Sequence, residues 1–349
     1  MSQVALIGLP NVGKSTVFSA LTKQISQIGT YPFSTTDLAV GLAEINDIRL
    51  SEASQIENSS KVTNVRLEIH DIPLNPNKPL FTPNLFGKLR EMDGFVVIVR
   101  DFEGNNIDWG IVPNSVTEQI EKIDIELIIA DIEILSNKES RLLKESKALS
   151  EKPKELETVK KALHLLNEGT KLSEYSWEDY ERSFFKDLSP LTLKPKVLLI
   201  NTEENRLHEK EFDYNSSEFV TTSAKIEHEI SLLGELEQIE MREEYQMKES
   251  LLNKLLFHIY KELNLVSFFT IGDKESKAWT IPRDSKITSA AGRIHTDLER
   301  GFIKAEVVGI DDFISFGGWK GLKNTTKLRL EGKDYVVRDG DVVIIRFSR

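Results

Sequence analysis

The stretch GLPNVGKST, residues 8–16, matches the pattern G-x-x-x-x-G-K-[ST] and decides the fold. It follows an apolar run, VALIG, which is typical of a short buried strand, and it leads into KSTVFSALTK, which has helical spacing. In such a loop, backbone N–H groups and the helix N-terminus surround phosphates, a lysine reaches the β and γ oxygens, and a hydroxyl ligates Mg2+. The sequence therefore predicts a strand, loop and helix unit that binds a nucleoside triphosphate.

The loop itself is expected to supply most contacts with the nucleotide. Lys14 would stabilise the transferring phosphoryl group, and Ser15 would be a Mg2+ ligand. The expected cofactor-binding residues of the loop are Asn11, Val12, Gly13, Lys14, Ser15 and Thr16.

Two polar residues further along the chain would complete the metal site. Thr35, in TYPFSTTD, would donate its hydroxyl to Mg2+ and its N–H to the γ-phosphate, which makes it a metal and catalytic candidate. Asp71 ends the alternating run NVRLEIHD and would hold a metal-bound water. Taken singly, Thr35 also fits an ordinary loop threonine and Asp71 a helix cap. Their order after the phosphate loop favours the metal site.

The base of the nucleotide would be read at two later strand ends. NTEE, residues 201–204, ends the apolar run KVLLI where a base-reading N-K-x-D is expected, so Asn201 and Glu204 are candidates. TTSAK, residues 221–225, would place the backbone N–H groups of Ser223 and Ala224 near the base.

Composition narrows the class of protein. The chain has 349 residues, of which 40% are hydrophobic and 29% charged, so it is long enough for two or three globular domains. It has no cysteine, which excludes disulfides and thiolate chemistry and favours a reducing compartment, which we expect to be the cytoplasm. No run approaches the roughly 18 apolar residues of a membrane span, and no signal peptide or membrane partner is expected.

Charge is spread unevenly along the chain. The net charge of −11 disfavours indiscriminate binding to polyanions. Residues 267–349, however, carry 15 Lys and Arg against 12 Asp and Glu. Contact with RNA is therefore expected of the C-terminal part more than of the rest.

Hydrophobic patterning divides the chain into three parts. The strands expected from NVRLEIHDI, DGFVVIVRD and KVLLINTEE indicate a parallel α/β sheet. Between the last two, residues 116–186 show helical spacing with a charged outer face, and Pro153 is expected at the turn of an αα-hairpin. After a last helix, short β-rich runs separated by glycines predict a compact β domain from about Leu265.

With these motifs assembled, the chain resembles the YchF subfamily of the Obg-related P-loop GTPases, the Obg-like ATPases. The resemblance covers nearly the full length. It rests on GLPNVGKST, YPFSTT, LTLKPKVLLINTEE, KAWTIP, AAGRIHTDLERGFIKAEV and EGKDYVVRDGDVV.

The resemblance implies an α/β fold with a P-loop NTPase G domain, an inserted coiled-coil-like helical arm and a C-terminal β-grasp TGS domain. The implied bounds are 1–115 with 190–264 for the G domain, 116–189 for the arm and 265–349 for the TGS domain. ATP would be accepted as well as or better than GTP, because the family has glutamate in place of the base-reading aspartate. The ribosome or ribosomal RNA would be a partner, through the arm and the TGS domain.

The second switch departs from the family pattern. The family has D-I-A-G-L, whereas this chain has Asp71, Ile72, Pro73 and Leu74, followed by a shorter, proline-rich segment. The family glycine lets a backbone N–H approach the γ-phosphate, and Leu74 brings a Cβ into that space. Losing one hydrogen bond to a charged group is worth about 1.5–3 kcal/mol, so we expect a weaker preference for triphosphate over diphosphate.

Three functions remain open on the sequence alone. The first is a slow ATPase or GTPase, stimulated by a partner such as the ribosome, and the intact phosphate loop favours it. The second is a nucleotide-binding module that has lost hydrolysis, and Leu74 favours it. The third is a small-molecule kinase, which is disfavoured because the sequence has no arginine-rich lid.

Overall fold

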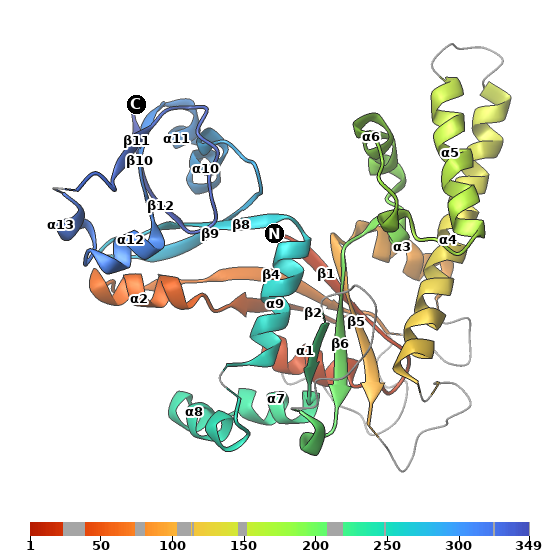
Figure 1. Ribbon diagram of the computed structural model, residues 1–349, viewed down its shortest axis with the longest axis horizontal. Helices are drawn as coiled ribbons and strands as arrows, with labels where there is room; N and C mark the ends of the chain where they lie inside the picture. Colours follow the sequence, from red (N-terminus) through yellow and green to blue (C-terminus); the bar gives the residue numbers. More distant parts are fainter. Residues whose placement is uncertain are drawn as a thin grey trace. The chain divides into compact units, whose positions relative to one another are not determined.

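The computed structural model describes residues 1–23, 39–73, 81–102, 113, 115–145, 152–207, 219–247, 249–323 and 325–348 (Figure 1). The chain forms two compact units. Unit 1 contains Met1–Ala43 and Glu68–Leu255, and unit 2 contains Glu44–Leu67 and Leu256–Arg349.

The sheet that carries the phosphate loop is parallel along its paired strands β4, β1, β5, β6 and β7. Strand β5 is buried along nearly its whole length, as its continuous apolar run predicts. Parallel pairing brings the carboxyl ends of these strands to one edge, where α/β sheets bind ligands. The strands, in spatial order, are β2 (Ala39–Ile45), β4 (Val65–Asp71), β1 (Gln3–Ile7), β5 (Gly94–Asp101), β6 (Lys196–Thr202) and β7 (Phe219–Thr222).

Helices connect these strands and extend from them. Three short 3-10 helices are η1 (Leu172–Glu174), η2 (Leu191–Leu193) and η3 (Glu204–Arg206). The α-helices, with α9 running on into unit 2, are α1 (Lys14–Thr22), α3 (Pro83–Glu91), α4 (Val116–Glu145), α5 (Lys152–Asn167), α6 (Asp179–Leu188), α7 (Ala224–Ser231), α8 (Glu235–Glu244) and α9 (Leu251–Glu262).

Helices are present where the sequence predicts them between residues 116 and 186, as α4, α5 and α6. Figure 1 shows α4 and α5 side by side, and the three helices share a core that contains Leu135, Val159 and Phe185. Pro153 lies in the first turn of α5 and not in the connecting turn that the sequence suggested. At that position its missing N–H costs no helical hydrogen bond.

Asp131 anchors α4 to the rest of unit 1. Its carboxylate is fully buried, and Oδ1 accepts hydrogen bonds from Arg90 Nη1 and from the Leu191 N–H, both at 2.9 Å. Oδ2 accepts from the N–H and the hydroxyl of Thr192, both at 2.8 Å. One side chain therefore joins α4, α3 and η2.

The C-terminal β-rich part folds around a sheet with strand order β11-β10-β12-β8-β9-β3. Its core includes Val266, Phe268, Ile287 and Val307. The elements of unit 2 are α2 (Ile48–Ile56), β3 (Val62–Thr63), β8 (Leu265–Thr270), β9 (Ser276–Pro282), α10 (Ile287–Ile294), α11 (Thr296–Arg300), β10 (Phe302–Gly309), α12 (Ile310–Ser315), α13 (Trp319–Leu322), β11 (Arg329–Glu331) and β12 (Asp341–Phe347).

Residues 44–67 belong to unit 2, whereas the sequence placed them with the phosphate loop. The pairing of β3 with β9, Val62 opposite Ser276, attaches this segment to the C-terminal sheet. Arg49 strengthens the attachment through an ion pair of 2.9 Å with Asp339, and a second ion pair, of 2.7 Å with Asp47, holds its guanidinium in place. Its hydrogen bond with Asp47 is the main cause that raises the pKa of the Arg49 guanidinium.

Candidate functional site

The phosphate loop lies between β1 and α1, as its sequence predicts. Gly8 has no room for a side chain, since an added Cβ would lie 2.4 Å from the Ile98 carbonyl oxygen. Gly13 adopts a left-handed conformation, with φ of 92°, immediately before α1. No side chain caps α1 among the described residues, so its first N–H groups are available to an anion.

Lys14, Ser15 and Asp71 come together at the start of α1. The Ser15 hydroxyl donates a hydrogen bond of 2.7 Å to Asp71 Oδ2, and Lys14 Nζ lies 3.5 Å from Asp71 Oδ1. Both charged side chains are largely buried, with 12% of Lys14 and 10% of Asp71 exposed. The structure thus brings the predicted phosphate-binding lysine to two of the three predicted metal ligands.

This donor set fits Mg2+. A hydroxyl and a carboxylate are hard oxygen ligands of the kind that Mg2+ prefers, and Mg2+ usually keeps several waters and phosphate oxygens as its other ligands. Asp71 Oδ1 is buried and accepts no hydrogen bond within the part of the chain that the structure describes. That oxygen is therefore available to a cation.

Asn201 ties the phosphate loop to the start of α7. Its Nδ2 donates a hydrogen bond of 2.9 Å to the Val12 carbonyl oxygen, and its Oδ1 accepts one of 2.8 Å from the Ala224 N–H. The Asn201 side chain is buried, so both bonds are shielded from water. Three residues that the sequence assigned to the nucleotide are joined in this way.

A pocket of about 580 Å³ opens beside the phosphate loop. Two strand-end loops, after β6 and after β7, form much of its wall. The residues predicted for the nucleotide that line it are Gly13, Thr16, Asn201, Glu204, Ser223 and Ala224. Its size is in the range of small-molecule sites, which span about 300–1,000 Å³.

Polar contacts hold the predicted base-reading segment in place. The Thr202 hydroxyl donates to the backbone oxygen of Asp101 at 3.2 Å, and Arg206 forms an ion pair of 2.9 Å with the Asp101 carboxylate. Glu204 accepts a hydrogen bond of 2.9 Å from Lys225 Nζ. This hydrogen bond is the main reason why the pKa of Lys225 is raised.

Two residues that the sequence singled out lie outside the described residues. They are Thr35, the third predicted metal ligand, and Leu74, in the second switch. Next to Asp71, His70 is buried, with its Nε2 2.7 Å from Glu68 Oε1. Alternation along β4 places His70 and Asp71 on opposite faces of the strand.

The pocket is also lined by residues that the sequence did not assign to the nucleotide, among them Phe102 and Lys225. Phe102 directly follows Asp101, the last residue of β5. Because ligands bind at the carboxyl ends of parallel strands, its position after a predicted strand could have identified it from the sequence. Lys225 lies in the TTSAK stretch, but its ion pair with Glu204 depends on the start of α7 meeting η3, which the sequence does not reveal.

We expect a Gly13→Ala substitution to weaken ATP binding about tenfold or more, since a left-handed conformation costs an alanine about 1–2 kcal/mol. The added Cβ would also lie 2.2 Å from Asn201 Nδ2 and displace that amide. Isothermal titration calorimetry measures the effect. Gly87→Ala is the matched control, because no described atom lies within 4 Å of its added Cβ. Equal affinities of Gly13→Ala and wild type would contradict the prediction.

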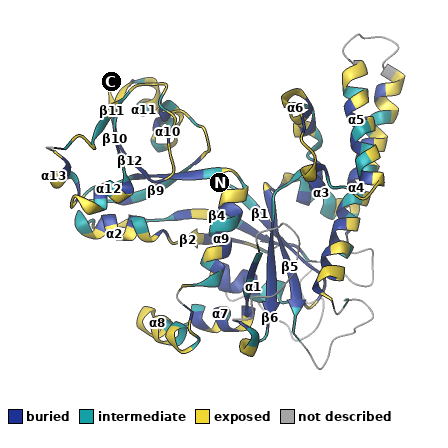
Figure 2. Cartoon of the chain, viewed as in Figure 1, coloured by how far each residue is buried: buried dark blue, intermediate teal, exposed yellow. Residues whose placement is uncertain are grey.

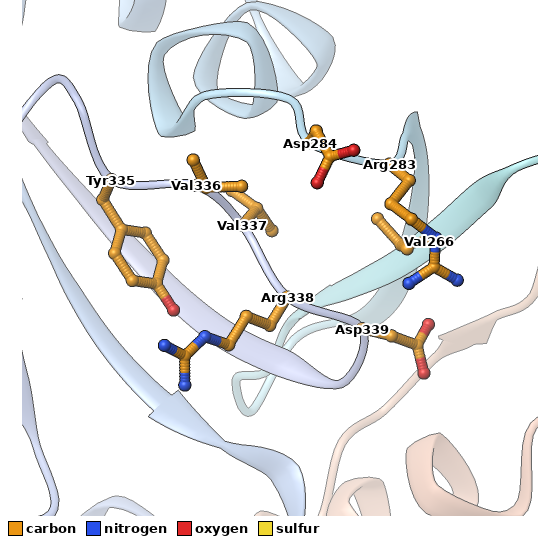
Figure 3. A pocket seen from close by; sticks show the side chains of 8 residues that line it. All are labelled: Val266, Arg283, Asp284, Tyr335, Val336, Val337, Arg338 and Asp339. Carbon is orange, nitrogen blue, oxygen red and sulfur yellow. The ribbon is translucent and has the colours of Figure 1, made fainter.

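A second pocket, of about 360 Å³, lies in unit 2 (Figure 3). Several of its polar groups already have partners: Asp339 accepts hydrogen bonds from the Ser267 N–H and from Arg49, and the Tyr335 hydroxyl donates to Asp341. Burial, more than any other cause, raises the pKa of Tyr335 to about 12. The pocket has no phosphate loop, so the pocket beside Gly13 is the candidate nucleotide site.

The fold and the loop define a P-loop NTPase. A family model described as "50S ribosome-binding GTPase" matches residues 3–202. A second model, YchF-GTPase_C, described as a protein of unknown function, matches residues 265–348. Within the described residues, no helix is both long and apolar enough to cross a membrane.

Known proteins match along nearly the whole chain. Proteins named "Ribosome-binding ATPase YchF" are 34% identical in Bacillus subtilis and 35% identical in Pasteurella multocida, each over 98% of this chain and 98% of the relative. The solved structure of the Schizosaccharomyces pombe YchF GTPase is 26% identical, with a TM-score of 0.85, and covers 99% of this chain and 97% of its own. The chain belongs to the YchF family of P-loop ATPases and GTPases.

Proposed function

We propose that the chain binds ATP or GTP with Mg2+ at the Gly13 pocket and hydrolyses the nucleotide slowly. The observation that carries the proposal is the meeting of Lys14, Ser15 and Asp71 at the start of α1. An uncapped helix N-terminus with a lysine beside it fits the phosphates of a nucleoside triphosphate. The hydroxyl and the carboxylate fit the Mg2+ that accompanies these phosphates.

Each group has a role in the proposed reaction. Mg2+ would neutralise charge on the β- and γ-phosphate oxygens. Ser15 would ligate it directly, Asp71 would act through a bound water, and Thr35 would complete the ligand set. Lys14 would stabilise the transferring phosphoryl group, and N–H groups of residues 11–16 would orient the phosphates.

The proposed base site favours ATP. Asn201 and the N–H groups at Ser223 and Ala224 border the pocket, and Phe102 offers an aromatic face for the base. Guanine would need the Glu204 carboxylate, which already pairs with Lys225 at 2.9 Å. Adenine does not need a contact with this carboxylate, so we propose that ATP binds at least as tightly as GTP.

The proposal also assigns the domains and a binding partner. We propose that residues 1–115 with 190–264 form the NTPase domain, apart from 44–67 and 256–264, which belong to unit 2. Residues 116–189 would form a helical arm and 265–349 a TGS domain. Relatives are named ribosome-binding, which supports the ribosome as the partner, reached through the arm and the TGS domain in the cytoplasm.

Removal of Mg2+ tests the proposed metal role. We expect chelation to weaken ATP binding about 10- to 150-fold, because a contact with a charged group is worth about 1.5–3 kcal/mol. Calorimetry with ATP, GTP and ADP, each with and without Mg2+, measures this. Adenosine, which has no phosphates, serves as the control ligand and should show no dependence on Mg2+. Unchanged ATP affinity after chelation would count against the proposed metal site.

A second candidate function is a binding module that has lost hydrolysis. Leu74, in place of the family glycine, favours it. Under that alternative the same pocket binds nucleotide and no phosphate is released.

A further inference from the structure

Helix α8 exposes large apolar side chains to solvent. Leu236 is 77% exposed and Ile239 is 53% exposed, and Leu232, at the end of α7, is 62% exposed. Figure 2 shows that most of α8 is coloured as exposed. Single exposed apolar residues are ordinary, but Leu236 and Ile239 lie three residues apart on one face of α8, and Leu232 lies just before this helix.

The fold of unit 1 does not use this face of α8. The opposite face packs on a cluster of buried side chains that includes Ile226 and Ile230, which Met241 and Tyr245 contact. At 100° per residue, Leu236 and Ile239 project roughly opposite to Met241 and Tyr245. The exposed stripe therefore contributes nothing to the packing of α8 on α7.

The helix that carries this apolar stripe is strongly acidic. Helix α8 has the sequence ELEQIEMREE, with five glutamates and one arginine. The arginine, Arg242, donates a hydrogen bond of 3.1 Å to Gln238 Oε1. Four of the glutamates form no ion pair or side-chain hydrogen bond within the described ranges, and they are Glu235, Glu240, Glu243 and Glu244.

We propose that Leu232, Leu236 and Ile239 dock a basic, amphipathic helix of a protein partner. The apolar stripe would bury the apolar face of that helix, and the glutamates beside it would pair with lysines or arginines at its edges. The acidic surface repels the phosphates of nucleic acid, so the occupant is not RNA. Residues 208–218 of this chain carry four acidic residues and one lysine, so they do not match the surface in charge.

The test uses purified full-length protein and two designed peptides. One peptide has leucines at helical spacing with lysines on the other face, and the second has glutamates in place of the lysines. Fluorescence anisotropy measures their binding. We expect the lysine peptide to bind wild type and the glutamate peptide not to bind.

Two double variants separate the apolar and the charge contribution. Leu236→Gln with Ile239→Gln should weaken binding of the lysine peptide about tenfold or more, since the complex would then bury polar amides in place of apolar side chains. Glu240→Gln with Glu243→Gln should also weaken binding and should reduce its dependence on salt. The matched control is Leu330→Gln, at a leucine that is 63% exposed in β11, and it should bind like wild type.

Several outcomes would overturn the proposal. One is equal affinity of the lysine peptide for wild type and for both double variants. Another is binding of a single-stranded RNA that the double variants lose. A third is a wild-type dimer in sedimentation that Leu236→Gln with Ile239→Gln dissociates, because the occupant would then be a second copy of the chain.

Discussion

Replacing Lys14 with alanine is expected to lower ATP affinity about 10- to 150-fold. The reason is that the substitution removes a hydrogen bond to a charged phosphate, and such a bond is worth about 1.5–3 kcal/mol. Lys14 is held at the start of α1, with Nζ 3.5 Å from Asp71 Oδ1 and only 12% of its side chain exposed. A lysine held there does not have to be ordered again when the phosphates arrive. Calorimetry with Mg-ATP measures the affinity.

The same substitution should reduce hydrolysis more than binding. Removing one group that stabilises developing charge in a transition state costs about 100- to 1,000-fold in rate. Lys160→Ala, at an exposed lysine of α5, is the matched control and should leave both quantities unchanged. If Lys14→Ala binds ATP as tightly as wild type, the phosphates do not lie at this loop.

Replacing Asp131 with alanine is expected to destabilise the protein by about 3–5 kcal/mol, the usual cost of removing one partner of a buried ion pair. The substitution removes the acceptor of Arg90 and leaves the N–H groups of Leu191 and Thr192 without a partner. These groups join α4, α3 and η2, so the loss falls where the arm meets the sheet of unit 1.

Chemical denaturation measures the effect of Asp131→Ala as a shift of the midpoint at constant slope. Asp187→Ala is the matched control, because Asp187 is an exposed carboxylate in α6. We expect the control to change the free energy of unfolding by less than about 0.5 kcal/mol. A similarly small change for Asp131→Ala would show that the buried carboxylate does not anchor the arm.

The phosphate loop could be predicted from the sequence because its function depends on local residues. Gly13 must accept a left-handed backbone, and Lys14 and Ser15 begin the helix directly after it. The strand ends that carry Asp71 and Asn201 were also predictable, since parallel sheets bring such ends to one edge. The structure places Asp71 and Asn201 on either side of this loop.

Contacts between distant segments could not be predicted. Strand β3 has only two residues, and its pairing with β9 joins positions more than 200 residues apart. Asp131 lies in a helix with many charges, and the sequence gives no sign that it alone is fully buried. The ion pair of Lys225 with Glu204 depends in the same way on α7 and η3, which meet only in the folded chain.

The exposed face of α8 has a practical consequence for functional work. Its apolar and acidic side chains lie outside the nucleotide pocket. Variants of these residues should therefore keep their affinity for nucleotide while they lose affinity for the proposed partner helix. Variants of the nucleotide site should lose affinity for nucleotide while they keep affinity for the partner helix. The two sets of substitutions therefore separate catalysis from partner binding in the same chain.

Single-turnover release of phosphate from Mg-ATP and Mg-GTP tests the central claim most directly. We expect wild type to release phosphate slowly, and faster than Lys14→Ala, at rates near the roughly 10⁻⁴ to 10⁻² s⁻¹ of such folds without an activator. If wild type binds both nucleotides but releases no more phosphate than Lys14→Ala, the chain does not hydrolyse nucleotide by itself, and the claim of a slow NTPase is wrong.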